Sequence, residues 1–495
     1  MASVEKEDLS RSGWTTLIIL SCLGLIVVFD ETMILPAIPD FIHNFNISYS
    51  TSSWLLSAYV IAAAVMTPIG GRLSDIYGKK KMLLIVMAVY IVGVLAGRFA
   101  TNIEFMIAAR ALQGVGMAMF PIAFGIIREV LPEKKLALGQ TIFGSSFPSG
   151  AVIGLVGGAA IIQNFGWQAT FLAILPVAIA LWLIIVKFIH VGTPAAMVSE
   201  NAADNTGLPD RRTIDLKGTM ALAATIISFL AGLTFLEGDA GTNYQAAGLF
   251  IASAVSLAAF IMIEKRVKLP LLDLKLMTSR NFLPPTMILM LTFMSIFMVY
   301  LTIPIIVRSP QPLGFGGDPV AVAAVQLPFM VVLLVGSITS GFILNRVKNT
   351  NLSLIGTIIA AAGFFVLLAF HSTTEMVSIG LTILAVGLSL TIAGAFNVIL
   401  VSLPMQVTGI ALGMTLLLNL VGMSVGPALA GIFQEVYQGT VPGVEGLFPT
   451  EDAYNWIFIV ASLVSVASVG MAVFVSRKKF VPATTTYQRE ADGHA

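Results

Sequence analysis

The chain has 495 residues, of which 57% are apolar and only 11% are charged. An ordinary soluble domain carries about 25% charged residues, so this composition excludes a soluble globular protein and indicates an integral membrane protein. The apolar residues suffice for about fourteen membrane-spanning helices of about 20 residues each. One cysteine excludes a disulfide framework, four scattered histidines argue against a metal centre, and a net charge of +1 gives no reason to expect nucleic acid as a partner.

Long apolar runs predict fourteen spans. The expected spans are 15–36, 53–71, 82–100, 104–127, 138–162, 168–190, 217–237, 245–264, 282–307, 319–345, 352–370, 376–399, 403–434 and 455–476. Residues 191–216 form the only long polar linker inside the chain. The first run carries an acid and lacks a small-residue cleavage site, so we expect a span there and not a cleaved signal peptide.

The positions of the basic residues predict the orientation, because loops rich in Lys and Arg stay in the cytoplasm. With both termini cytoplasmic, all but three of the 27 Lys and Arg residues lie in cytoplasmic segments. Arg98 and Arg308 fall outside, and Arg110 lies within a span. One miscounted helix would destroy this asymmetry downstream of the error.

The first six and the last six spans resemble each other at an offset of about 270 residues. Gly71–Asp75 corresponds to Gly341–Asn345, and the Gly150/Gly154 pair corresponds to Gly422/Gly426. Chance similarity among glycine-rich helices is the alternative. The repeat predicts an all-α membrane protein of two six-helix bundles with a substrate path between them and two inserted central helices. The expected divisions are a first bundle at 1–190, a cytoplasmic linker at 191–216, the inserted helices at 217–264, a second linker at 265–281, a second bundle at 282–476 and a cytoplasmic tail at 477–495.

The most specific motif is the loop Gly71-Arg-Leu-Ser-Asp-Ile-Tyr-Gly-Lys-Lys-Lys81. It resembles the cytoplasmic signature between helices 2 and 3 of the major facilitator superfamily, and the resemblance implies that fold. A basic turn alone would explain the lysines but not the spaced glycines and acid. The resemblance implies a conformational latch that joins the two halves in the outward-facing state, with a dock near Thr408 and a weaker copy at Asn345. The latch residues are Gly71, where we expect a close helix approach, and Arg72, Asp75, Gly78 and Lys79.

Three further motifs extend the resemblance. Arg110, Gln113 and Gly114 are similar to the RxxQG signature of the family. A helix-packing face resembles the antiporter motif, although Leu155 stands where the family usually has Pro. Its residues are Gly150, Gly154 and Gly158, with Gly422, Gly426 and Pro427 in the repeat copy. The segment Pro270–Leu276 is similar to that of the fourteen-span drug/proton antiporter branch.

Asp30, Glu31 and Arg110 are ionisable residues inside expected spans, where each costs about 2.5–3.5 kcal/mol on insertion scales and marks a candidate functional site. Asp30 and Arg110 each lie six residues from a span end, about 9 Å below the outer surface, so we expect them at similar depth. Our hypothesis is that both residues line one cavity, in which Asp30 exchanges protons and a cationic substrate competes for it. The alternative is a permanent pair that holds two helices in register. Glu31 points about 100° away, so it is a secondary acid, expected at the outer rim.

Other candidates for the substrate cavity are methionines, whose flexible side chains suit a pocket of variable shape, and scattered polar residues. Met287, Met290, Met294 and Met298 fall on one helical face, for which ordinary packing or lipid contact is the alternative. The polar candidates are Gln113, Tyr300, Gln326, Asn397 and Asn419.

These features predict a proton-coupled transporter in the cell membrane that exports amphipathic, often cationic compounds by alternating access. We expect a monomer in the lipid bilayer that uses the proton gradient and needs no cofactor. The main alternative is a transporter of the same fold for one metabolite or lipid. A passive channel fits the repeat and the latch less well. An enzyme is not expected, since the sequence has no Walker motif, metal cluster or usable nucleophile, and a receptor would leave the buried charges without a purpose.

Overall fold

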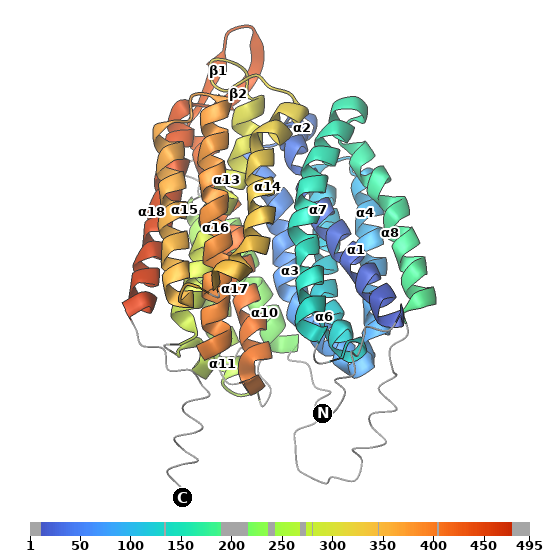
Figure 1. Ribbon diagram of the computed structural model, residues 1–495. Helices are drawn as coiled ribbons and strands as arrows, with labels where there is room; N and C mark the ends of the chain where they lie inside the picture. The colour runs from blue at the N-terminus through green and yellow to red at the C-terminus, as the bar shows by residue number, and fades with distance from the viewer. Residues whose placement is uncertain are drawn as a thin grey trace, which may run out of the picture.

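The computed structural model describes residues 11–132, 135–189, 216–235, 243–267, 274–279, 281–344, 346–402 and 405–477. These segments form long helices that run side by side, with a small β-hairpin beyond one end of the bundle (Figure 1). We call this end the hairpin end. The opposite end, where α3 meets α4 at Lys79, Lys80 and Lys81, is called the basic end.

Within the part of the first half that the structure describes there are ten helical elements. They are α1 (Arg11–Met33), η1 (Leu35–Ala37), α2 (Ile38–Phe45), α3 (Tyr49–Tyr77), α4 (Lys79–Arg98), α5 (Ile103–Gly114), η2 (Val115–Ala118), α6 (Met119–Val130), α7 (Leu136–Phe165) and α8 (Gln168–Phe188).

The rest of the chain contains a helix pair, a short helix and the second set of long helices. The elements are α10 (Leu216–Phe235), α11 (Asn243–Glu264), α12 (Leu274–Met277), α13 (Leu283–Arg308), α14 (Pro319–Leu344), α15 (Asn349–Ala369), α16 (Thr374–Ser402), α17 (Met405–Val436), β1 (Gln438–Val441), β2 (Val444–Pro449) and α18 (Glu451–Arg477). The two strands pair antiparallel, with Gln438 opposite Pro449.

Within the described residues, thirteen helical segments are long and apolar enough to cross a membrane. The remaining expected span, 217–237, corresponds to α10, whose apolar part covers only Lys217–Leu233. At 1.5 Å per residue this part is about 26 Å long, somewhat less than the roughly 30 Å hydrocarbon core. The fourteen-span count is therefore not established, although thirteen of the expected spans correspond to helical segments long and apolar enough to cross a membrane.

The first span differs from the simple helix expected at 15–36. Helix α1 ends at Met33, because Pro36 lacks an N–H donor and its ring disturbs the preceding turn. The chain continues through η1 and the short helix α2, which ends at Asn46 with a left-handed φ of 49°. Helix α3 then starts behind Ser48, whose hydroxyl accepts a hydrogen bond from the Thr51 amide at 3.0 Å. These turns bring η1 and α2 to the hairpin end.

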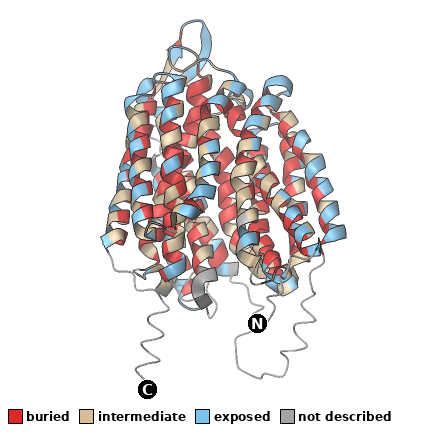
Figure 2. Cartoon of the chain, viewed as in Figure 1, coloured by how far each residue is buried: buried red, intermediate tan, exposed pale blue. Residues whose placement is uncertain are grey.

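The packing follows the internal repeat. Helix α1 lies along α7, and its repeat counterpart α13 lies along α17. The two halves meet through α3 against α17 and α7 against α14. Buried residues gather where helices face one another, while exposed residues cover the outer faces (Figure 2). Large apolar side chains such as Ile153, Leu183 and Phe365 are exposed there, which suits contact with lipid.

The inserted helices α10 and α11 pack mainly against each other. Helix α10 also contacts both α3 and α17, so it lies beside the seam where the two halves meet. Leu222 and Ile226 of α10 share a hydrophobic cluster with Ile61 of α3 and Met414 of α17. The pair therefore covers one lateral side of the junction between the halves.

Candidate transport site

The centre of the first half contains a fully buried arginine. Arg110 of α5 donates through Nε to the Leu55 carbonyl oxygen at 3.1 Å and through Nη1 to Gln113 Oε1 at 2.6 Å. Its guanidinium carbon lies 4.5 Å from the centre of the Tyr59 ring, a cation–π contact. Tyr59 was not predicted from the sequence, because an aromatic residue in an apolar run does not show which way it faces.

Gln113 and Gly114 explain the rest of the RxxQG signature. The Gln113 amide nitrogen donates to the Gly93 carbonyl oxygen at 3.0 Å, so Gln113 ties Arg110 to α4. A side chain at Gly114 would collide with the carbonyl oxygen of Tyr59. The glycine lets α5 approach α3 closely enough for Arg110 to reach Leu55. Gln113 thus belongs to the arginine network and does not line the pocket described below.

Asp30 of α1 faces this arginine. Its Oδ2 atom lies 3.5 Å from Arg110 Nη1, and both side chains are 0% exposed. Within the described part of the chain, neither Asp30 oxygen has a hydrogen-bond partner, and the same holds for Arg110 Nη2 and the Tyr90 hydroxyl. The expected similar depth of Asp30 and Arg110 is found. The pair is an incompletely satisfied buried polar cluster. Such a cluster costs folding free energy, so its presence marks a candidate functional site.

Glu31 directly follows Asp30 in α1. Its side chain is 9% exposed, so it is buried and not at the outer rim, where we expected it. The rim position assumed that α1 runs straight to the surface, whereas η1 and α2 fold over its end. Consecutive helical residues point about 100° apart. Glu31 nevertheless interacts electrostatically with Arg110 and Asp30, and also with Tyr300 of α13 in the other half.

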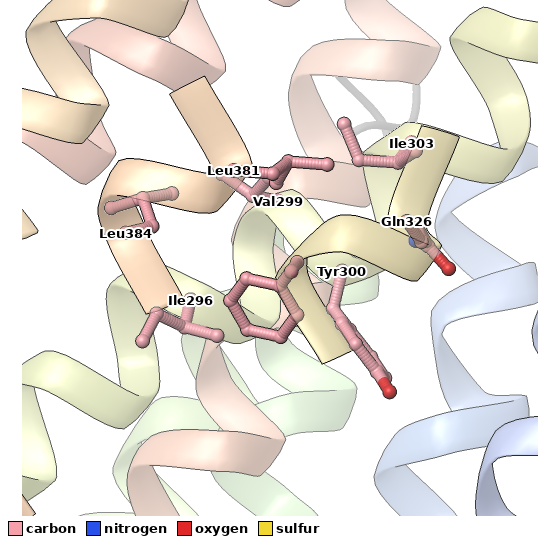
Figure 3. Close-up of a pocket in the computed structure, with 8 residues that line it drawn as sticks. Ile296, Val299, Tyr300, Ile303, Gln326, Leu381 and Leu384 are labelled. Atoms are coloured by element: carbon pink, nitrogen blue, oxygen red, sulfur yellow. The ribbon is translucent and has the colours of Figure 1, made fainter. Parts of the chain in front are cut away.

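A small pocket lies between α13, α14 and α16 (Figure 3). It is lined by Ile296, Val299, Tyr300, Ile303, Gln326, Phe329, Leu381 and Leu384. Tyr300 and Gln326 line this pocket, and their expected role in a substrate cavity stays a prediction.

The methionine stripe occupies another face of α13. The Met290 and Met294 carbonyl oxygens lie against Gly422 and Gly426 of α17, and Met298 is buried among the helices. None of the four methionines lines this pocket, and neither Asn397 nor Asn419 does. Met287 is half-buried near the basic end of the same helix. The backbone of α13 at Met290 and Met294 thus packs against α17, and the role of the methionine side chains in a substrate cavity stays a prediction.

The loop that resembles the latch signature makes contacts within the first half. Gly78 adopts a φ of 97°, a conformation that favours glycine and turns α3 into α4. Lys79 forms ion pairs with Glu129 and, at 3.5 Å, with Asp75, whose side chain is 70% exposed. The close approach expected at Gly71 is found at Gly70, where a Cβ would lie 2.6 Å from Ala118.

Some expected features lie outside the described residues. They are Asn345, the side chain of Thr408, the linker from 191 to 215, the first part of the 270–276 motif and the tail after Arg477. Arg72 of the loop makes a polar or electrostatic contact. The latching role and the domain boundaries thus remain predictions.

The small-residue face is used twice. A Cβ at Gly150 or Gly158 would lie 2.5 Å from the backbone oxygen of Leu25 or Met33 in α1. In the repeat copy, Gly422 and Gly426 contact the backbone of α13 in the same way. Leu155, which replaces the proline of the family motif, is fully buried between the halves. Both bundles therefore bring one helix into backbone contact with the helix that carries the candidate site residues.

Polar contacts between the halves gather at the hairpin end. Arg308 Nη1 lies 2.6 Å from Asp40 Oδ2 and donates to the Pro36 carbonyl oxygen at 3.1 Å. The Tyr49 amide donates to Glu435 at 2.9 Å. Deeper in, the Ser57 hydroxyl donates to the Ser424 carbonyl oxygen at 2.9 Å. The described structure is thus joined at its hairpin end, a feature that composition and spacing did not predict.

The fold and the buried charges define a multi-pass membrane transport protein. The model of the Major Facilitator Superfamily matches residues 20–427, and the chain belongs to this family. The fold is that of a solved autoinhibited peptide transporter of the POT family, with a TM-score of 0.66 over 96% of this chain and 98% of that chain at 14% identity. The many apolar spans place the protein in the cell membrane as a multi-pass protein.

Curated relatives are similar over most of their length. The chain is 28% identical to the multidrug efflux pump LfrA of Mycolicibacterium smegmatis, over 89% of this chain and 84% of the pump. It is 26% identical to multidrug resistance protein 3 of Bacillus subtilis, over 76% of this chain and 70% of that protein. It is 25% identical to the probable actinorhodin transporter of Streptomyces coelicolor, over 84% and 72% of the two chains.

Proposed function

We propose that this chain is a proton-coupled transporter that exports amphipathic, often cationic compounds by alternating access, with the proton gradient as its energy source. The observation that carries the proposal is the buried Asp30–Arg110 pair, in which neither carboxylate oxygen has a hydrogen-bond partner among the described residues. A pair kept only for helix register would gain by satisfying these atoms. An incompletely bonded carboxylate beside a fixed cation is suited to take up and release a proton.

The proposed cycle uses the charge of Asp30. The deprotonated carboxylate attracts Arg110 and holds α1 against α5, whereas the protonated group leaves the arginine to Leu55, Gln113 and the Tyr59 ring. Arg110 keeps those partners in both states, so only the α1 contact changes. Because α1 packs along α7, which meets α14 of the other half, a change at Asp30 can bias the junction between the halves.

The orientation and the cargo are part of this proposal. The hairpin end faces outside, because the basic end carries the lysines of the α3–α4 turn. The names of the relatives, a multidrug efflux pump and a multidrug resistance protein among them, support export of varied compounds. The alternative, a transporter of one metabolite or lipid with or without proton coupling, would share the fold but not the response to varied cations.

The test uses proteoliposomes that contain the full chain and an internal pH dye. A proton gradient is imposed, and a panel of lipophilic cations is added to wild type, Asp30→Asn and the matched control Asp452→Asn, whose acid is exposed at the start of α18. We expect substrate-dependent proton movement in wild type and control and its loss in Asp30→Asn. Proton movement that persists in Asp30→Asn would contradict the coupling role. Its absence in folded wild type with every cation would favour the metabolite or lipid transporter.

A further inference from the structure

We propose that Tyr90 is a positioning residue for proton exchange at Asp30: its hydroxyl donates a hydrogen bond to the deprotonated Asp30 carboxylate and gives up this bond when Asp30 is protonated. The inference rests on the proposed proton-coupled transport and deepens it, since it names a second residue that controls the pH at which Asp30 exchanges its proton. Tyr90 keeps its own proton throughout, so the proton that Asp30 releases passes to water.

Tyr90 lies on the face of α4 that packs against the helix of the buried arginine. The carbonyl oxygen of Gly93, one turn further along α4, accepts the hydrogen bond from the Gln113 amide at 3.0 Å. A Cβ at Gly116, in the short helix η2 directly after α5, would lie 2.8 Å from the Tyr90 ring. The Tyr90 side chain is 0% exposed. Helix α4 therefore presents Tyr90 to the interior of the first half.

The face of α1 that carries Asp30 points to the same interior. Val27 and Ile34 lie three residues before and four residues after Asp30, at helical spacing. Both are buried in the hydrophobic cluster that contains Tyr90. Asp30 and Arg110 also act electrostatically on Tyr90, with opposite signs. The tyrosine is therefore a neighbour of the buried pair, contributed by a third helix.

The unsatisfied atoms of this cluster are complementary. Among the described residues, the Tyr90 hydroxyl and Arg110 Nη2 are buried donors without a hydrogen-bond partner, and both Asp30 oxygens are buried acceptors without one. Leu55 and Gln113 already hold the other nitrogens of the guanidinium. In a place that excludes water, an unpaired donor and an unpaired acceptor gain most by bonding to each other. The deprotonated carboxylate can thus accept from the arginine and from the tyrosine.

Tyr59 does not offer an equivalent group. Its ring contacts the Arg110 guanidinium, and its hydroxyl already donates to a carbonyl oxygen of α1 at 3.3 Å. The remaining titratable groups of these surroundings are Glu31 of α1, which interacts with the buried pair, and Tyr300 of α13, which interacts with Glu31. Tyr90 is therefore the available donor, and Glu31 has to be controlled for in the test.

The experiment titrates Asp30 directly in the purified full chain in lipid nanodiscs. Infrared difference spectroscopy follows the C=O stretch of protonated carboxyl groups, and the band that Asp30→Asn lacks belongs to Asp30. We expect Tyr90→Phe to move the midpoint of this band to higher pH by about one unit or more, since a hydrogen bond to a charged group corresponds to about that shift. The sign follows because the lost O–H group stabilises only the carboxylate.

The same variant has a transport readout. In proteoliposomes, the pH dependence of substrate-dependent proton movement should shift in the same direction in Tyr90→Phe. Its melting temperature should not fall, because the removed hydroxyl has no hydrogen-bond partner in the described structure. A merely structural role would change the stability and leave the pH dependence where it is.

Two further variants separate other causes. Tyr454→Phe removes a buried hydroxyl of the second half, which hydrogen-bonds to Ser309 at 3.4 Å, and should leave the Asp30 midpoint unchanged. Glu31→Gln removes the second acid of α1. In this background Tyr90→Phe should still move the Asp30 midpoint upward, because the hydroxyl acts on Asp30 itself.

Three results would overturn the inference: an Asp30 midpoint in Tyr90→Phe at or below that of wild type, a shift that Tyr454→Phe reproduces, or no Asp30 band in either wild type or Tyr90→Phe. Proton movement that survives in Asp30→Asn contradicts the export proposal whatever the infrared titration shows. Conversely, a shifted Asp30 band without any substrate-dependent proton movement would support the role of Tyr90 and contradict proton-coupled export. The two proposals therefore fail separately.

Discussion

Gln113 positions the buried side chain of Arg110. It accepts a hydrogen bond from Arg110 Nη1 and donates one to the Gly93 carbonyl oxygen, all within the interior of the first half. Without it, Arg110 Nη1 would lose its hydrogen-bond partner in a place that excludes water. At such a site the missing partner costs more than the bond itself contributes.

We therefore expect Gln113→Leu to lower the free energy of unfolding by about 1–3 kcal/mol. Thermal unfolding in detergent measures this loss, with Gln245→Leu on the exposed face of α11 as the control. The released guanidinium can also move closer to Asp30, so the number of protons moved per substrate should change. A variant as stable as wild type with an unchanged proton ratio would show that Gln113 does not position Arg110.

The sequence predicted Asp30 and Arg110 as partners because depth in a membrane follows from counting residues along a helix. It did not predict Tyr59 or the unsatisfied Tyr90 hydroxyl, since the rotation of α3 and α4 about their axes is set by packing. For the same reason the sequence left open whether the methionine face of α13 packs or lines a cavity, and the pocket described here lies on the face that carries Tyr300.

At the scale of helices, backbone contact between α1 and α7 depends on individual glycines. A Cβ at Gly154 would collide with the Thr32 hydroxyl and lie 2.6 Å from the Phe29 carbonyl oxygen. A Cβ at Gly157, three residues along, would lie 3.6 Å from the Phe29 ring, an ordinary contact. The two positions form a matched pair on one helix.

We expect Gly154→Ala to destabilise the protein by about 1–3 kcal/mol, because the helices must move apart. Gly157→Ala should be neutral or stabilising by up to about 1 kcal/mol, since alanine favours a helix. Thermal unfolding of both variants in the same detergent distinguishes them. Equal melting temperatures would mean that the helices separate without cost and that the glycine face does not hold α1 in place.

Apolar runs predicted the long helices well, because in lipid a spanning segment must satisfy its own backbone hydrogen bonds. The elements that were not predicted lie at or beyond the ends of the apolar runs. The bend through η1 and α2 depends on two prolines within a few residues, and the hairpin comes from a short glycine-rich stretch between two spans. These two elements form much of the hairpin end, so its contacts could not be predicted either.

For the whole molecule, the described contacts between the halves indicate a state that is closed at the hairpin end. The Arg308–Asp40 pair is only partly exposed, at 19% and 24%, and Arg308 also binds the Pro36 carbonyl oxygen. Alternating access requires such contacts to break when this end opens. The free energy of these contacts therefore contributes to the balance between the state that is closed at the hairpin end and the state that is open there.

Ser50 provides a probe of that balance, since it is 1% exposed where α3 meets Gly431 of α17. In a Cys22→Ser background, we expect Ser50→Cys to react slowly with a membrane-impermeant maleimide in intact cells. Adding Arg308→Ala should raise the labelling rate about fivefold, because a partly exposed pair contributes roughly 1 kcal/mol to the closed state.

Arg98→Ala removes a cation from the same end without touching the other half and should leave the rate unchanged. The charge swap of Asp40→Arg with Arg308→Asp should restore slow labelling. Equal rates for Arg308→Ala and Arg98→Ala would show that the pair does not close this end, and labelling only in inverted vesicles would reverse the proposed orientation.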